Sequence, residues 1–257
     1  MLAIYRKELR SYFINPIGYI YLGVFLVAAA ALFYFTVLSR ATYNTALYFT
    51  ILVGALVVLI PLLTMRLFAE ERKLRTEQLL LTAPVTLTGM VLGKYFAALT
   101  VYAAGVLASC INFIPLYVIG AAEQADQTKS LVSNVGPVTG EILGGVFALL
   151  LVGAALIAVG TFISSLTENQ LSAAVISVGV IGGMTLIGLL NTITDANGQP
   201  WIRAAWIRTV LSWASVLSRF AGFTNGIFDF AALFYYLSLA FVFLFFTIRV
   251  YEKRRWA

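Results

Sequence analysis

Ionisable side chains gather in one short stretch of a chain that is otherwise strongly apolar. The stretch "MRLFAEERKLRTEQLLLTAP" spans residues 65–84, and its charged members are Arg66, Glu70, Glu71, Arg72, Lys73, Arg75 and Glu77. Lysine and arginine beside apolar segments set membrane topology, whereas acidic residues contribute little to it. The glutamates therefore need another explanation. A helix of mixed charge, ended by Pro84, is typical of a surface that binds a protein partner.

The chain offers little that could carry catalysis or hold a metal. It has no histidine and one cysteine, Cys110, so the commonest general base is absent and no intrachain disulfide can form. The stretch "GMVLGK" at 89–94 looks like a phosphate-binding loop, but that loop has four residues between its glycines and Ser or Thr after the lysine. Here three residues separate the glycines, and Tyr95 follows Lys94. We expect no catalytic residue, metal or cofactor in this chain.

Composition places the protein in a membrane. Of its 257 residues, 61% are hydrophobic and 11% are charged, whereas soluble domains are about 45–50% apolar and about 25% charged. The mean hydropathy is +0.94. A net charge of +6 could suggest nucleic acid in a soluble protein. Here the cations flank apolar segments, so we expect contacts with the lipid bilayer and no nucleic-acid partner.

The elements that position the charged stretch are predicted to be helices, in an all-α polytopic membrane protein with a single transmembrane domain over 1–257. Residues 1–15 have apolar positions at helical spacing with cations between them, which predicts an amphipathic helix at the membrane interface. Pro16 disfavours helix at Asn15. Apolar runs predict six transmembrane helices at about 17–38, 47–65, 95–120, 143–165, 171–193 and 231–250.

The distribution of Lys and Arg predicts the orientation. Three lie in 1–15, five in 66–94 and four in 249–255, against five on the opposite side. The positive-inside rule then places both termini and the charged stretch in the cytoplasm. The interiors of the predicted spans contain no Asp, Glu, Lys or Arg, which argues against a transporter driven by ions that titrate within the membrane.

The segment 194–230, between the fifth and sixth spans, predicts an amphipathic or re-entrant element on the outer side. Arg208, Ser212, Ser215 and Arg219 would form a polar stripe at helical spacing, and tryptophans suit the headgroup layer. Either this element only rests on the membrane, or it is an outer gate or docks an external partner. In the second case the candidate residues are Trp206, Arg208, Trp213, Arg219 and Asp229.

Glycines spaced four apart allow helix backbones to approach closely. Such pairs occur at Gly140 and Gly144 and at Gly179 and Gly183. A chain with 20 glycines also contains such pairs by chance, so they say little about packing and less about dimerisation.

Three parts of the chain resemble the ABC-2 type permeases, the membrane subunits of many ATP-driven exporters. They are "RKELRSYFINPIGYI" (6–20), "MRLFAEERKLRTEQLLLTAPVTLTGMVLGKYFA" (65–97) and "GIFDF…YYLSL…FLFFTIRVYEKRRW" (226–256). With the plan of six spans, the resemblance covers most of the chain. The third part is similar to permeases associated with bacterial gliding motility and with maturation of nitrous-oxide reductase. This resemblance implies a place in a bacterial inner membrane.

The resemblance also implies a cytoplasmic coupling helix between the second and third spans, which docks in a groove of a separate ATPase subunit. The coupling residues would be Glu8, Glu70, Glu71, Arg72, Thr76, Glu77, Leu80 and Pro84. One position departs from the family, which commonly has glycine before the Thr-Glu pair where this chain has Arg75. The implied complex contains two ATPase subunits, which bind ATP and Mg²⁺, and a second permease copy or a paralogue.

The function expected from the sequence is that of a non-catalytic permease subunit. It would couple ATP hydrolysis in a partner to export or to movement of a periplasmic protein. Two alternatives stay open: a membrane scaffold that transmits ATPase motion without transport, and a gradient-driven transporter. The transported substrate cannot be read from the sequence, because a path lined by apolar and small residues has no chemical code.

Overall fold

The structure is a computed structural model that describes residues 1–76, 78, 86–125, 136–190, 204, 206, 209, 211, 215–224 and 226–256. In these residues the regular secondary structure is helical, without a strand. Within the same ranges, six helices are long and apolar enough to cross a membrane. The sequence predicts this number and this class, and both are confirmed.

The long helices are α2 (Ile17–Phe33), α3 (Ala46–Thr64), α6 (Leu87–Ser109), α9 (Thr139–Leu166), α10 (Gln170–Leu190) and α13 (Phe230–Trp256). The shorter helices are α1 (Leu2–Ile14), α4 (Ala69–Lys73), α7 (Ile114–Ala125) and α12 (Val216–Thr224). A π-helical turn, Tyr34–Leu38, extends α2, and a 3₁₀ turn, Cys110–Phe113, joins α6 to α7.

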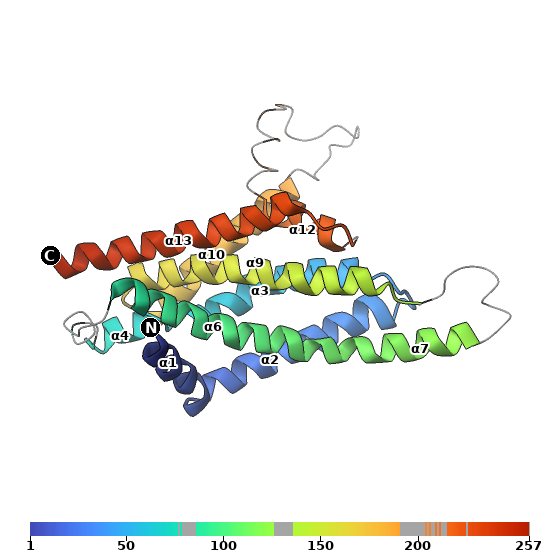
Figure 1. The fold of residues 1–257 in the computed structure, drawn as a ribbon, viewed down its shortest axis with the longest axis horizontal. Coiled ribbons are helices and arrows are strands. Elements are labelled where there is room, and N and C mark those ends of the chain that lie inside the picture. The colour runs from blue at the N-terminus through green and yellow to red at the C-terminus, as the bar shows by residue number, and fades with distance from the viewer. Residues whose placement is uncertain are drawn as a thin grey trace.

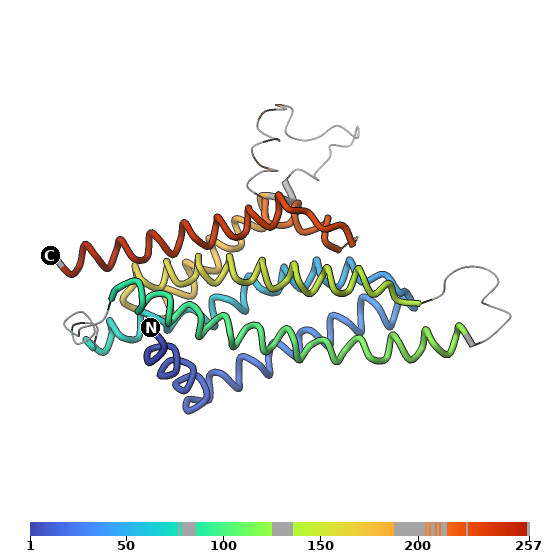
Figure 2. The backbone as a smooth tube through the Cα atoms, viewed as in Figure 1, coloured from blue at the N-terminus to red at the C-terminus, as the bar shows by residue number. Residues whose placement is uncertain are grey.

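Helix α9 is the centre of the bundle (Figures 1 and 2). It packs against α3, α6, α10 and α13. Of the 18 residues in its most apolar stretch, 61% are buried, against 22% in the corresponding stretch of α10. Glycines permit this close packing: a Cβ on Gly153 would overlap the ring of Tyr102, and one on Gly145 would overlap the ring of Phe49. Small residues at such contacts let membrane helices approach.

The glycine pairs singled out in the sequence coincide with this packing at one position only. A Cβ on Gly144 would lie 2.6 Å from the carbonyl oxygen of Phe223, so Gly144 lies against the end of α12. A Cβ on Gly140, Gly179 or Gly183 would meet nothing within 4 Å. The spacing pattern therefore does not identify the glycines that hold the bundle together.

Helices α1 and α2 meet at the predicted break. Asn15 has extended backbone angles, φ −82° and ψ 147°, because the ring of Pro16 disfavours the helical conformation in the preceding residue. The chain changes direction there, so that α1 lies at an angle to α2 (Figure 1). Ile4 and Tyr12 of α1 are buried, and α1 packs on the first turns of α6.

The third long helix begins eight residues before the predicted start at 95. From Leu87 to Gln124 the helix runs for 38 residues, about 57 Å at about 1.5 Å per residue, against about 30 Å of hydrocarbon. Its last part, α7, extends beyond the other helices (Figure 1). The earlier start also places Lys94, a loop residue in the prediction, inside α6.

Both termini lie at the same end of the bundle, beside α4 (Figure 1). There the side chain of Arg254 donates a hydrogen bond to the carbonyl oxygen of Ser165, at the end of α9, with Nη2 and O 2.7 Å apart. We call this the N-terminal end. The clusters of cations in 1–15, 66–75 and 249–255 all lie at this end of the bundle.

Candidate functional site

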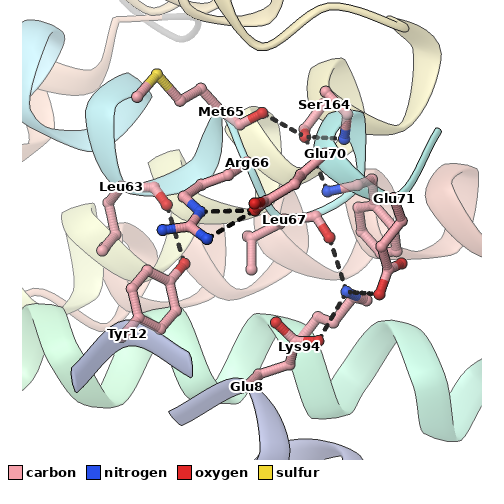
Figure 3. Close-up of polar contacts among 12 residues, drawn as sticks. Glu8, Tyr12, Leu63, Met65, Arg66, Leu67, Glu70, Glu71, Lys94 and Ser164 are labelled. Carbon is pink, nitrogen blue, oxygen red and sulfur yellow. Dashed lines mark hydrogen bonds and ion pairs between the residues drawn. The ribbon is translucent and has the colours of Figure 1, made fainter. Parts of the chain in front are cut away.

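The charged stretch begins with a tight connection from α3 to α4 that is fixed by a side chain of α9. The Ser164 hydroxyl accepts hydrogen bonds from the backbone N–H groups of Phe68 at 3.2 Å and Ala69 at 3.3 Å, and lies 3.2 Å from the carbonyl oxygen of Met65 (Figure 3). The first N–H groups of a helix have no partner within the helix. Ser164 supplies that partner and so anchors the start of α4 to the centre of the bundle.

Lys94 joins three separate elements through its buried ammonium group. Its Nζ lies 3.0 Å from a Glu8 carboxylate oxygen on α1, 2.9 Å from Glu71 on α4 and 2.8 Å from the carbonyl oxygen of Leu67 (Figure 3). The Lys94 side chain is 1% exposed, and its ammonium lies 5.2 Å from the centre of the Phe68 ring. An ammonium has three donors, so this arrangement satisfies all of them.

A second buried cation lies next to this cluster. Nε and Nη2 of Arg66 lie 2.8 and 2.7 Å from one carboxylate oxygen of Glu70. Beside them the Tyr12 hydroxyl donates a hydrogen bond to the carbonyl oxygen of Leu63 at 2.9 Å. Burial, together with the nearby Glu8 carboxylate, raises the pKa of Tyr12. Tyr12 therefore remains a neutral donor that holds α1 against the end of α3.

Arg72 connects α4 to the turn between α9 and α10. Its Nη1 donates to the carbonyl oxygen of Leu166 at 3.0 Å, and its Nη2 pairs with the Glu168 carboxylate at 2.8 Å. Together with Glu71, which pairs toward α6 and α1, Arg72 ties the short helix to both sides of the bundle. A displacement of α4 would have to move these elements or break their ion pairs.

Helix α4 ends in a Schellman motif. The N–H of Thr76 donates to the carbonyl oxygen of Glu71, and the N–H of Arg75 donates to that of Arg72, both at 3.0 Å. This motif requires a left-handed residue, and Arg75 has φ +57°. The requirement gives a physical reason for glycine at the matching position of the resembling family. Helix α4 ends at Lys73, so the predicted helix is interrupted there. Its predicted end at Pro84 lies outside the described residues.

The predicted coupling residues fall into three groups. Glu8, Glu70, Glu71 and Arg72 are at most partly exposed and form ion pairs within the chain. Thr76 is exposed. Glu77, Leu80 and Pro84 lie outside the described residues.

The exposed tip of the stretch consists of Lys73, Leu74, Arg75 and Thr76. Leu74 is 64% exposed, although it is a large apolar side chain in a charged setting. Contact with an ATPase stays a prediction. Within 66–76, the exposed residues are those of the tip.

The described members of the predicted outer site make separate contacts and do not form one cluster. The Arg219 guanidinium, on α12, lies 5.0 Å from the centre of the Tyr235 ring on α13. Asp229 accepts a hydrogen bond from the N–H of Ala231 at 2.8 Å, which caps the start of α13. Trp206 is 72% exposed. Arg208 and Trp213 lie outside the described residues. The hydrogen bond that caps α13 is sufficient to explain an aspartate at position 229.

Lys94 is the main residue that the sequence reasoning missed. The charge count predicts only a topology cation at Lys94, yet the glycines before it indicate close packing. A Cβ on Gly93 would lie 3.3 Å from Cγ2 of Ile4 and 3.3 Å from the carbonyl oxygen of Met1. The stretch "GMVLGK", which only looks like a phosphate loop, is thus a packing surface for α1, and this packing brings Glu8 to Lys94.

Comparison with known proteins leaves the family open. No protein-family model matches the chain, and no curated protein matches it. In the described ranges no three His, Cys, Asp or Glu residues form a group that could hold a metal ion. The resemblance to ABC-2 permeases therefore remains an expectation, supported by residues rather than by a match.

Proposed function

We propose that this chain is a non-catalytic permease subunit of the ABC-2 type in a bacterial inner membrane, with both termini in the cytoplasm. Two copies of a separate ATPase subunit would bind ATP and Mg²⁺, and a second permease copy or paralogue would complete the complex. The observation that carries the proposal is the construction of α4. It presents an exposed tip, while its inward side chains are paired with α1, α6 and the turn between α9 and α10.

A tip anchored in this way can transmit a displacement by a bound partner to the transmembrane helices. Leu74 and Arg75 offer an apolar side chain and a cation to a docking groove. Behind them, Glu71 pairs with Lys94 of α6 and Arg72 pairs with Glu168 beside α10. Because the Glu71–Lys94 pair is shielded from water, a shift of the tip would be transmitted to α6 and not absorbed by a loose loop.

The positions of the buried charges also favour energy supplied by a partner ATPase over energy from an ion gradient. Among the described residues, the buried charged side chains are Arg66 and Lys94. Both are ion-paired at the N-terminal end, far from the middle of the long helices. Proton-driven and sodium-driven transporters usually carry ionisable groups near the middle of the membrane, so the gradient-driven alternative has less support.

Variants of the exposed tip test the proposal. The tagged chain is co-expressed with the ATPase subunit encoded nearest to its gene, and the ATPase retained on the purified chain is measured. Leu74→Asp and Arg75→Glu should reduce retention, for Leu74 by at least about tenfold, since a buried leucine contributes about 1.5–3 kcal/mol.

Arg255→Glu is the matched control, because Arg255 is also exposed at the N-terminal end. It should retain the ATPase at the wild-type level. Equal retention by all three variants, or no ATPase retained by the wild-type chain, would contradict the proposal.

A further inference from the structure

A cavity of about 400 Å³ lies between α1 and the charged stretch. Lys7, Glu8 and Ser11 line it from α1, and Arg66, Glu70 and Leu74 line it from the other side. A recess of about 20 Å³ shares part of this wall and reaches Tyr12. The larger volume is typical of a site for a small molecule.

Arg66, one of the residues that line the cavity, has a buried donor without an acceptor. The Arg66 side chain is 9% exposed, and its Nε and Nη2 are bound to Glu70. Its Nη1 is buried and has no hydrogen-bond partner among the described residues. Figure 3 shows the Arg66 guanidinium between Tyr12 and Glu70. Because a buried charged donor strongly favours an acceptor, this nitrogen points to a ligand that carries an oxygen.

The charges around the cavity indicate what kind of ligand fits. The lining contains three cations, Lys7, Arg66 and Lys94, and three carboxylates, Glu8, Glu70 and Glu71. A simple anion would meet the carboxylates, and a simple cation would meet the ammonium and guanidinium groups. A zwitterion avoids both repulsions, because its anionic oxygens can face Arg66 and Lys7 while its ammonium faces the carboxylates of Glu8 and Glu70.

The positive end of such a ligand should be a primary ammonium. It can donate hydrogen bonds to carboxylates, whereas a quaternary ammonium cannot donate and is usually held by aromatic rings. None of the described residues that line the 400 Å³ cavity is aromatic. The cavity lies under α1 at the N-terminal end, beyond the last turn of α3, where lipid headgroups meet a membrane protein.

We propose that this cavity binds a phosphoethanolamine group, the zwitterionic headgroup of phosphatidylethanolamine. Arg66 and Lys7 bind the phosphate oxygens, and Glu8 and Glu70 accept hydrogen bonds from the ammonium. Leu67 packs on the carbon atoms beside the phosphate. The inference requires a membrane protein but no ATPase partner, so it stands or falls separately from the proposed function.

The test uses the full chain in bilayer discs of phosphatidylcholine that contain equal minor fractions of phosphatidylethanolamine and phosphatidylglycerol. After release into mild detergent, native mass spectrometry measures the lipids that stay bound. Phosphatidylethanolamine should be retained at least about tenfold above either competitor, the factor that one charge-assisted hydrogen bond supplies. Preference for phosphatidylglycerol, or retention of all three lipids in proportion to their content in the discs, would overturn the proposal.

Two variants and a control locate the site. Arg66→Gln should abolish the preference, and Lys7→Gln should reduce it without harm to folding, because Lys7 is 64% exposed and its nearest carboxylates are 3.7 and 3.8 Å away. Arg249→Gln removes an exposed cation of α13 and should leave the preference intact. If Lys7→Gln and Arg66→Gln both behave like Arg249→Gln, the cavity is not the site.

Soluble glycerophosphoethanolamine distinguishes a lipid from a free ligand. If it displaces retained phosphatidylethanolamine, the headgroup carries the binding and the lipid is its source in the membrane. If it binds the wild-type chain but not Arg66→Gln, while no lipid is retained, the source is the soluble molecule. If neither form binds, the proposal is wrong.

Discussion

Replacement of Lys94 by methionine should destabilise the protein strongly. The Lys94 side chain is 1% exposed, and its ammonium lies 3.0 and 2.9 Å from the carboxylates of Glu8 and Glu71, whose side chains are 13% and 15% exposed. Its removal leaves two shielded carboxylates close together without a cation. Breaking a buried ion pair in this way costs about 3–5 kcal/mol, which corresponds to a fall in Tm of about 6–20 °C for a chain of this size.

Two comparisons separate lost pairing from lost packing. Lys7→Met removes an exposed cation that lies 3.8 and 3.7 Å from the same two carboxylates, and an exposed pair contributes less than about 1 kcal/mol. The triple variant Glu8→Gln, Glu71→Gln, Lys94→Met removes all three charges. It should recover most of the stability, because replacing a whole buried ion cluster is often close to neutral.

Unfolding of the purified protein in detergent, followed by tryptophan fluorescence, measures all three variants. The reasoning is refuted if Lys94→Met is as stable as Lys7→Met. It is also refuted if the triple variant is no more stable than Lys94→Met, since the cost would then come from packing or from the hydrogen bond to Leu67 and not from uncompensated charge.

Two further predictions concern the backbone. Arg75→Gly should raise stability by about 1 kcal/mol because Arg75 has φ +57° and a left-handed residue with a side chain costs about 1–2 kcal/mol; Lys73→Gly, in the helix just before it, should lower stability by about 1 kcal/mol. Gly153→Ala should cost about 1–3 kcal/mol because its Cβ would overlap the buried ring of Tyr102. Gly179→Ala, with open space around it, should leave the same thermal-unfolding midpoint unchanged or higher.

The sequence predicts the architecture well because the membrane requires a simple pattern. A helix that crosses hydrocarbon must be apolar along its length, and that property can be read from composition alone. The break at Asn15 is equally readable because proline restricts its predecessor for local steric reasons. Six long helices and the separate α1 follow from these two rules, and the described residues confirm both.

The candidate site was less readable because its contacts join distant parts of the chain. Lys94 pairs with Glu8, 86 positions away, and no periodicity reports such a pair. Counting charges for topology treats every lysine alike, so a buried lysine and a solvated one give the same signal. Likewise, α4 ends at a residue with left-handed backbone angles. A glycine in the sequence would have predicted that conformation, but the residue is Arg75.

The charged stretch therefore contains two sets of side chains that the sequence alone does not distinguish. Its inward side chains, Glu71 and Arg72, fix α4 to the bundle, while Leu74 and Arg75 form its exposed tip. A variant at Glu71 would release a carboxylate from buried Lys94 and disturb the fold, so lost ATPase binding there would have two explanations. A variant at Leu74 removes no contact that holds α4, so a loss of binding there reports on docking itself.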